Sequence, residues 1–416
     1  MPLQIPSPVV ILRADHYSAL GIMRSLGRLG IPTYAVHATA DAPALKSRYC
    51  TGSFIWDLDA SPELDSVRFL LDLRRKIEGR PVLIATNDET ALFVSTHASA
   101  LKEHFFFPKN SPDLVRSLYN KREMYHIAKE LRIPTAETIF PRKREEVLAF
   151  ARTAQFPVML KACDNIAVSR RTGKKMVITR SPEELIQHYD AMEDPRNPSL
   201  MLQEYIPGKD DSVWMFNGYF DDQSNCLFGI TGRKIHQTPV YTGMTALGVC
   251  LPNPDVYEQT CRLVKEKGYK GILDIGFRYD QRDGSYKLLD VNPRLGATFR
   301  LFVGKDGMDV VRAQYLHLTG QTVNASEGQP GRKWIVEDAD IVSSLHYFRD
   351  RALSFSEWIS SYHGIQEGAW FSNDDWLPFI HVGTRFLWKP FRRFGLRSRR
   401  RGEVTRVFRA MSVGKC

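Results

Sequence analysis

Apolar runs and helical periodicities alternate along the first 110 residues of the chain. Buried parallel strands are predicted at three short apolar runs, Val9–Leu12, Thr33–Val36 and Val82–Ala85. Apolar residues recur at helical spacing between the first two runs, and Gly30 follows as a left-handed helix stop. After the third run, Asn87 begins the cap of a helix expected from Thr90 to Leu101. This alternation predicts right-handed crossovers and a parallel sheet.

Between residues 111 and 199 the pattern is one of capped helices and short strands. Helices are expected to open at Ser111, Asn120 and Ser181. A strand at Phe156–Lys161 ends on a lysine, and a second strand is expected at Met176–Ile178. The residues between these strands form a polar loop rich in arginine, lysine and glycine.

Strands dominate from residue 200 to about 330. They are expected at Leu200–Ile206, Ser212–Phe216, Cys226–Ile230, Gly271–Tyr279 and Tyr286–Val291. A helix is expected near Val256–Gly268, and the Asp-Gly step in the last connection predicts a β-hairpin. The chain then becomes aromatic-rich. We therefore divide it into an N-terminal domain (1–110), a small α+β subdomain (111–199), a mixed-sheet subdomain (200–330), an aromatic-rich extension (331–384) and a basic tail (385–416).

Length and composition are those of a globular protein with more than one core. A chain of 416 residues is expected to form two or three packed subdomains. No apolar run reaches the roughly 20 residues that span a bilayer. The N-terminal residues lack a charged segment before an apolar stretch, so we expect no signal peptide. Six scattered cysteines without a CxxC pair indicate free thiols and a cytoplasmic protein.

The net charge of +10 lies entirely in the basic tail. Residues 385–416 carry eleven Lys and Arg residues against one acid, Glu403, which leaves 46 basic and 46 acidic residues in the remainder. Aromatic residues interleave with these cations, a composition that suits an anionic membrane surface. The alternatives are a solvated tail and an arm for nucleic acid or another polyanion. A neutral body argues against a specific nucleic-acid groove.

Two positions in the middle of the chain are candidates for binding a polyphosphate nucleotide. Lys161 at a strand end, beside the Gly/Arg/Lys loop, suits phosphate groups, although most strand-end lysines only reach solvent. Glu204 has the chemistry to bond an adenine or ribose edge while Ile206 packs the ring. Considered alone, the segment from Glu204 to Gly208 is better explained as a strand that ends in a proline turn.

The motif Asp290-Val291-Asn292-Pro293-Arg294 is more specific. Asp290 and Asn292 point to one face of a strand, where a carboxylate and an amide oxygen converge. Hard oxygen ligands of this kind suit Mg²⁺ bridging phosphates. Arg294 stands where a guanidinium stabilises a transferring phosphoryl group or an acyl phosphate. The alternative reading is a surface turn before a proline.

The order of these motifs resembles the ATP-grasp superfamily, and most closely its carboxylate–amine ligase branch, which includes D-aspartate ligases. The resemblance covers roughly residues 8–325. It implies an α/β fold in which a Rossmann-like N-terminal domain precedes a two-part ATP-grasp fold, a small α+β lid and a mixed-sheet domain. The matching positions are Lys121 and Lys161 for ATP phosphates and adenine, Glu204 at the hinge, Ile206 beside adenine, Asp210 or Asp211 for ribose, Asp290 and Asn292 for metal, Arg294 for catalysis, and Arg233 and Lys234 for substrate or phosphate.

One position departs from the family pattern. The family has a further metal-binding acid on the strand before Asp290, and alignment puts Gly276 there. Asp274 lies on the same strand face two residues earlier, about 7 Å away by strand rise. We take Asp274 as the alternative third metal ligand.

The resemblance implies an ATP-dependent ligase that forms an amide through an acyl phosphate. ATP with Mg²⁺, or Mn²⁺ as the alternative, would be the cofactors, and an amino acid would be one substrate. A homodimer and a lipid-linked acceptor at a membrane surface are further expectations. The rival hypotheses are a catalytically degenerate nucleotide-binding protein, favoured by Gly276, and a nucleic-acid-binding protein that uses its tail.

Overall fold

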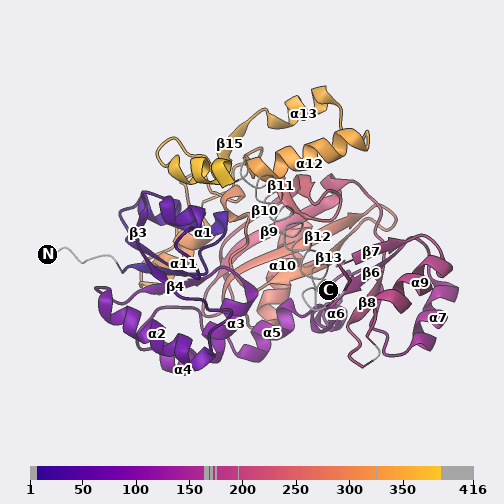
Figure 1. The fold of residues 1–416 in the computed structure, drawn as a ribbon, viewed down its shortest axis with the longest axis horizontal. Helices are drawn as coiled ribbons and strands as arrows, with labels where there is room; N and C mark the ends of the chain where they lie inside the picture. The colour runs from indigo at the N-terminus through magenta and orange to yellow at the C-terminus, as the bar shows by residue number, and fades with distance from the viewer. Residues whose placement is uncertain are drawn as a thin grey trace, which may run out of the picture.

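Three β-sheets organise the part of the chain that this computed structural model describes, which is residues 7–163, 168, 172–173, 176–194, 196–324 and 326–385. Figure 1 shows the N-terminal sheet on the left, the lid sheet on the right and the largest sheet between them, with the C-terminal helices along the top. The basic tail after Arg385 and most of the loop 162–175 lie outside the described residues.

The N-terminal sheet is parallel, with strand order β3-β2-β1-β4. Its strands are β1 (Val9–Leu12), β2 (Thr33–His37), β3 (Cys50–Ile55) and β4 (Val82–Ala85). All four side chains of β1 are buried, as expected for an apolar strand covered on both faces. The predicted parallel sheet and three of its strands are confirmed.

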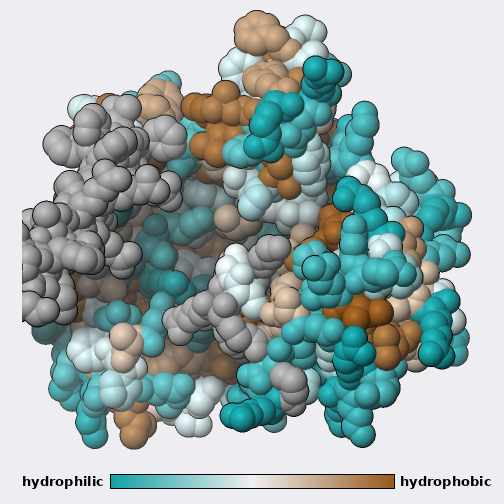
Figure 2. All heavy atoms as spheres, turned by 45° about the vertical axis from the view of Figure 1, so that its right-hand side comes forward, coloured by the Kyte–Doolittle hydropathy of each residue, from teal (hydrophilic) through white to brown (hydrophobic). Residues whose placement is uncertain are grey.

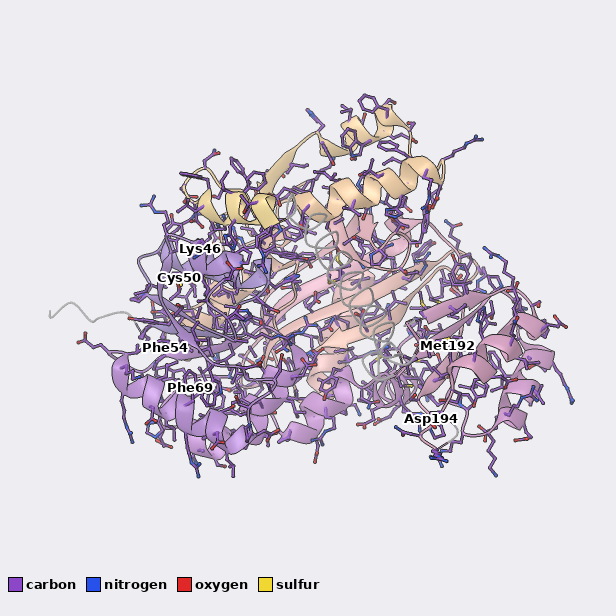
Figure 3. The ribbon with its side chains drawn as sticks, in the orientation of Figure 1. Lys46, Cys50, Phe54, Phe69, Met192 and Asp194 are labelled. Carbon is purple, nitrogen blue, oxygen red and sulfur yellow. The ribbon has the colours of Figure 1, made fainter. Side chains whose placement is uncertain are left out.

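Helices connect and cover this sheet. They are α1 (Tyr17–Gly27), α2 (Glu63–Lys76), α3 (Asp88–Thr96) and α4 (Ala98–Leu101), with a short 3₁₀ turn η1 (Pro43–Lys46). Asn87 caps α3 by accepting a hydrogen bond from the Thr90 amide, but the helix predicted to run to Leu101 is interrupted at His97. Phe54 and Phe69, labelled in Figure 3, pack at the edge of the core on the α2 side.

The second sheet, called the lid sheet after the predicted lid, has the strand order β5-β8-β6-β7. All of its strand pairs are antiparallel. Its strands are β5 (Thr138–Ile139), β6 (Val158–Ala162), β7 (Met176–Thr179) and β8 (Leu200–Glu204). The helices of this region are α5 (Pro112–Tyr119), α6 (Lys121–Glu130), α7 (Arg144–Thr153) and α9 (Pro182–Met192), and Met192 is labelled on the lid side of Figure 3. Because β8 pairs with β5 and β6, the predicted boundary at residue 199 falls before a strand that belongs to the lid sheet.

The largest sheet has seven strands in the order β13-β12-β9-β10-β11-β14-β15. They are β9 (Val213–Phe220), β10 (Cys226–Thr238), β11 (Met244–Cys250), β12 (Gly271–Asp280), β13 (Ser285–Asn292), β14 (Lys333–Ile335) and β15 (Ile365–Gly368). The predicted hairpin is confirmed as the antiparallel pair β12–β13. Two strands of the sheet, β14 and β15, come from the aromatic-rich extension, which is therefore built into the core domain.

The remaining elements surround this sheet: α10 (Pro254–Lys267), α11 (Val310–Leu318), α12 (Glu337–Arg349), α13 (Phe355–Tyr362) and the short turns η2 (Asp210–Ser212) and η3 (Phe299–Leu301). Alternate side chains give the sheet two distinct faces. The inner face, which carries Met215 and Phe228, packs on α1 and α11 toward the N-terminal sheet. The outer face, which carries Phe216 and Leu273, packs on α6 and α10.

A buried ion pair joins the extension to the N-terminal domain. Arg24 of α1 and Asp375 are each 3% exposed, and their Nε and Oδ2 atoms lie 2.9 Å apart. The Asp375 carboxylate also accepts hydrogen bonds from the Ser47 hydroxyl and the Arg48 amide. Segments near the two ends of the described chain are thus held together through one carboxylate.

Candidate active site

Two carboxylates and an amide converge on the inner face where β12 pairs with β13. Asp274 lies opposite Asn292, and Gly276 lies opposite Asp290. The Asn292 amide nitrogen is 3.2 Å from Asp274 Oδ2 and 3.4 Å from Asp290 Oδ2. Asn217 of β9 donates to the other Asp274 oxygen over 3.0 Å. The structure therefore brings together the three predicted metal ligands.

The electrostatics of this cluster favour a bound cation. The pKa of Asp274 is raised to about 6, chiefly by burial and also by the nearby Asp290 carboxylate, against the opposite effects of Arg294 and Lys234. Among the described residues, no three His, Cys, Asp or Glu side chains form a metal site. The cluster offers two carboxylates and the Asn292 amide, whose nitrogen faces them and whose oxygen accepts from Arg294. Mg²⁺ commonly uses one or two carboxylates and completes its shell with water and phosphate oxygens, so these residues fit it.

Gly276 leaves room that the Asp290 side chain occupies. A Cβ atom at position 276 would overlap Asp290 Oδ1, well inside van der Waals contact. An acidic residue at 276 would therefore require Asp290 to move. Asp274, on the same face two residues earlier, supplies the second carboxylate of the cluster instead.

Arg294 follows β13, and its guanidinium donates hydrogen bonds to three different residues. Its Nη2 donates to Asn292 Oδ1 and its Nη1 to the Leu295 carbonyl, each over 3.0 Å. Its Nε donates over 3.0 Å to Asp88, the first residue of α3 in the N-terminal domain. Sequence reasoning missed Asp88 as a site residue. Its position, after the carboxyl end of β4 and in the first turn of a helix, is the signal that marks such sites in parallel sheets.

Lys234 and Arg233, predicted together, lie on opposite faces of β10. Lys234 is on the inner face, where Asp290 and Asp274 interact with its ammonium group, although burial lowers its pKa. Its Nζ donates to the Gly243 carbonyl over 2.8 Å. Arg233 pairs with Val249 of β11 and lines a cavity on the outer face. The structure brings Lys234 to the carboxylate cluster and does not bring Arg233 there.

The two predicted phosphate lysines lie together at the end of β6. Lys121 begins α6, and its Nζ donates to the Ala162 carbonyl over 2.7 Å. Lys161 Nζ donates to Gln203 Oε1 over 2.7 Å. The pKa of Lys161 is lowered to about 8, chiefly by burial and next by Lys121, against the opposite effect of Asp290 of the large sheet. Lid lysines and core carboxylates thus share one electrostatic environment.

The predicted hinge acid Glu204 ends β8 and pairs with cations of the β12–β13 hairpin. Arg282 approaches within 2.6 Å and Lys287 within 3.7 Å, and both also contact Asp280. Hydrogen bonding to Arg282 and Lys287 lowers the pKa of the buried Asp280. The neighbouring Ile206 is buried. The lid strand is therefore linked to the hairpin at the point where the chain passes from one sheet to the other.

The two candidate ribose acids differ in their environment. Asp210 is buried and accepts hydrogen bonds from the Gln237 amide over 2.8 Å and from the Tyr347 hydroxyl. Asp211 is exposed. Since both Asp210 oxygens are already engaged, Asp211 is the acid that remains open to a ligand.

Comparison with known proteins agrees with the fold. No protein-family model matches the chain. D-aspartate ligase from Enterococcus faecium (strain Aus0004) is 28% identical over 245 residues, or 56% of this chain and 57% of that ligase. The chain therefore matches little more than half of that relative's length.

Solved structures match over more of the chain. N5-carboxyaminoimidazole synthetase from Staphylococcus aureus, complexed with ADP, has a TM-score of 0.61 at 11% identity, covering 84% of this chain and 87% of that one. The biotin carboxylase domain of Hydrogenobacter thermophilus 2-oxoglutarate carboxylase, with MgADP, ADP and bicarbonate, has a TM-score of 0.58 at 18% identity, covering 78% and 72%. In fold, the chain is therefore similar to these synthetase and carboxylase structures, and in sequence it is similar to part of a D-aspartate ligase.

Proposed function

We propose that the protein is an ATP-dependent carboxylate–amine ligase that uses an amino acid as one substrate. The observation that carries this proposal is the interaction between a lysine of the lid sheet and a carboxylate of the large sheet. Lys161 of the lid, which lies beside Lys121, interacts electrostatically with Asp290 of the large sheet, and Asn292 joins Asp290 to Asp274. A polyphosphate needs cations on one side and a metal-binding carboxylate set on the other. The similarity to a D-aspartate ligase supports an amino acid as the amine.

The reaction proceeds in two displacements. A carboxylate oxygen of the first substrate attacks the γ-phosphorus of ATP, the bond to the β,γ-bridging oxygen breaks, and an acyl phosphate and ADP form. The amine of the second substrate then attacks the acyl carbon, phosphate leaves, and the amine loses a proton. Lys161 and Lys121 hold phosphate oxygens, and Arg294 stabilises charge on the acyl phosphate. Lys234 binds the substrate carboxylate beside them.

Asp290, Asn292 and Asp274 are the residues that would hold Mg²⁺, with Mn²⁺ as the alternative ion. When bound, the ion neutralises negative charge on the phosphates. Glu204, Ile206 and Asp211 are proposed to bind the adenine and ribose. The ion pairs of Glu204 with Arg282 and Lys287 orient its carboxylate at the hinge.

The test is ADP release with Mg-ATP across a panel of amino acids and other carboxylates. ADP release that depends on a substrate and is lost in Asp290→Ala is the expected result. Substrate-dependent release that persists undiminished in Asp290→Ala would contradict the site. Mass spectrometry of the product identifies the amide.

A second candidate, a degenerate protein that binds nucleotide without ligating, is favoured by Gly276. If nucleotide binds and no substrate stimulates ADP release, the result supports this degenerate, nucleotide-binding protein. Gly276→Glu then tests it, although Asp290 must shift to admit the new side chain. Turnover gained by this variant would identify the missing acid as the defect.

We also propose that the C-terminal region contacts an anionic membrane surface, where a lipid-linked acceptor would be available. No helix in the described part of the chain has the length and apolarity needed to span a bilayer. Support comes from the basic composition of 385–416 and from exposed apolar side chains such as Leu345, Phe355 and Trp376. Figure 2 shows apolar side chains gathered at the top of the molecule, the level at which Figure 1 shows α12 and α13.

Vesicle flotation with and without residues 385–416 tests this surface. Loss of flotation with anionic vesicles on removal of the tail is expected, and equal flotation of both forms contradicts the proposal. Salt-sensitive binding of the tail to DNA or RNA would favour the nucleic-acid alternative instead. The predicted homodimer remains a prediction, which sedimentation of the full chain tests.

A further inference from the structure

An open cavity of about 960 Å³ lies on the outer face of the large sheet, away from the carboxylate cluster. Its floor is formed by Arg233 of β10, Val249 of β11 and Lys333 of β14, which are paired in register and share one face. Its far side is formed by the end of α12, by α13 and by the connection between them. The volume is at the upper end of the range for sites that hold organic ligands.

Arg233 is the distinctive side chain of this cavity. Its Nε is buried, and the described residues offer it no hydrogen-bond partner. A buried guanidinium N–H without an acceptor destabilises a protein, because its hydration is lost without replacement. Arg233 lines the cavity, and its planar guanidinium matches a carboxylate or phosphate group.

The other charged groups of the wall leave an excess of positive charge. Lys333 donates to two backbone carbonyls, of Ser361 and His363, which are neutral. The buried acid of the wall, Asp210, is engaged by Tyr347 and Gln237. A second acid, Glu357, caps α13. The exposed acid Asp211 lines the same cavity as two cations, Lys209 and Arg351, so these three residues together add one positive charge.

Apolar side chains complete the wall. Ile235, Val249, Leu251 and Leu353 line it beside the cations. We propose that this cavity is a second binding site, for a small organic anion in which a carboxylate or phosphate group pairs with Arg233 and an apolar body packs on these side chains. The cavity lies apart from the carboxylate cluster, because Arg233 and Lys234 point to opposite faces of β10, and it adjoins the proposed nucleotide site at Asp211.

The experiment is isothermal titration of the full chain with octanoate and with octyl phosphate, which distinguish a carboxylate from a phosphate head group. At least one of them is expected to bind with a stoichiometry of one, also in the presence of saturating Mg-ADP. Arg233→Gln should weaken that binding roughly tenfold or more. The matched control is Arg152→Gln, which removes an exposed arginine from the surface of α7.

Variants of the apolar wall separate this site from general apolar binding. Leu353→Glu introduces a repelling carboxylate into the cavity and should also weaken binding. Ile341→Glu introduces a carboxylate into a different apolar groove and should leave binding of the probe unchanged. Circular dichroism and thermal unfolding confirm that each variant is folded. Absence of binding by both probes, equal binding to Arg233→Gln and wild type, or displacement by Mg-ADP would each overturn the proposal.

Discussion

The two faces of the seven-stranded sheet differ in how their charged side chains are hydrogen bonded. On the inner face, Asp274 is hydrogen bonded to two asparagines, and Arg294 is fixed by Asp88 and Asn292. On the outer face, Arg233 borders an open cavity and its buried Nε has no acceptor in the described structure. The same strand, β10, contributes Lys234 to the first environment and Arg233 to the second.

This difference shows how a single sheet can carry a pre-organised catalytic site on one face and an open binding site on the other. Side chains that are mutually hydrogen bonded are held in place before substrate arrives, which favours chemistry because little reorganisation remains. A cationic side chain that borders an open cavity remains available to an incoming anion, which favours binding. Substitutions on the inner face should therefore change turnover, and those on the outer face should change ligand affinity.

The largest effect is expected from Asp290→Ala. Removal of this carboxylate leaves Asp274 as the one remaining acid of the cluster, so ADP release should fall by roughly 100-fold or more. Steady-state ADP release at saturating Mg-ATP and substrate measures it. Turnover within a few-fold of wild type would contradict the placement of the metal ligands.

Arg294→Ala should lower turnover by about tenfold or more while ATP affinity changes little, since the arginine is proposed to act on the acyl phosphate. Asp88→Asn tests whether the N-terminal domain positions this arginine. It should lower turnover by a smaller factor and leave the ATP affinity unchanged. A change confined to affinity in either variant would place Arg294 on the nucleotide instead.

The neighbours Lys234 and Arg233 provide the most direct comparison of the two faces. Lys234→Ala should lower turnover by about tenfold, because an ammonium group beside the substrate carboxylate is lost. Arg233→Ala should lower turnover by less. Parallel assays of the two variants under one set of conditions measure the ratio, and a larger loss in Arg233→Ala would reverse the assignment of the faces.

The smallest effect concerns pH. Burial lowers the pKa of Lys161 to about 8, so its ammonium form, which binds phosphate, is present below pH 8 and is lost as pH rises through 8. The KM for ATP should therefore rise several-fold between roughly pH 7 and pH 9. Lys161→Arg keeps its charge over this range and should flatten the profile. An unchanged slope in that variant would assign the dependence to another group.

Local patterns predicted much of the fold because apolar runs and helix caps act within a few residues. Val9–Leu12 and the caps at Asn87, Asn120 and Ser181 are all found where the sequence predicts them. β11 and β14 are not predicted. Gly248 weakens the strand pattern of β11, which forms as the antiparallel partner of the preceding strand β10. The three residues of β14 give too short a signal, and this strand forms through pairing with β11, far earlier in the chain.

The site was predicted less completely, for a related reason. Strand alternation brings Asp290 and Asn292 to one face and could be read directly from their spacing. It also separates Arg233 from Lys234, but only the packing of the N-terminal sheet decides which of them faces the cluster. Asp88 comes from another domain, and its contact with Arg294 depends on tertiary structure that no local pattern encodes.

The pair Arg24–Asp375 has a consequence for how the protein is made. The two residues are 351 positions apart, so at a synthesis rate of about 5–20 residues per second, α1 waits roughly 20–70 s for its partner. During that interval the N-terminal domain leaves the ribosome with an arginine and the Ser47–Arg48 turn open to solvent. The final packing of α1 is therefore a late event, in which a segment translated long after α1 closes over it.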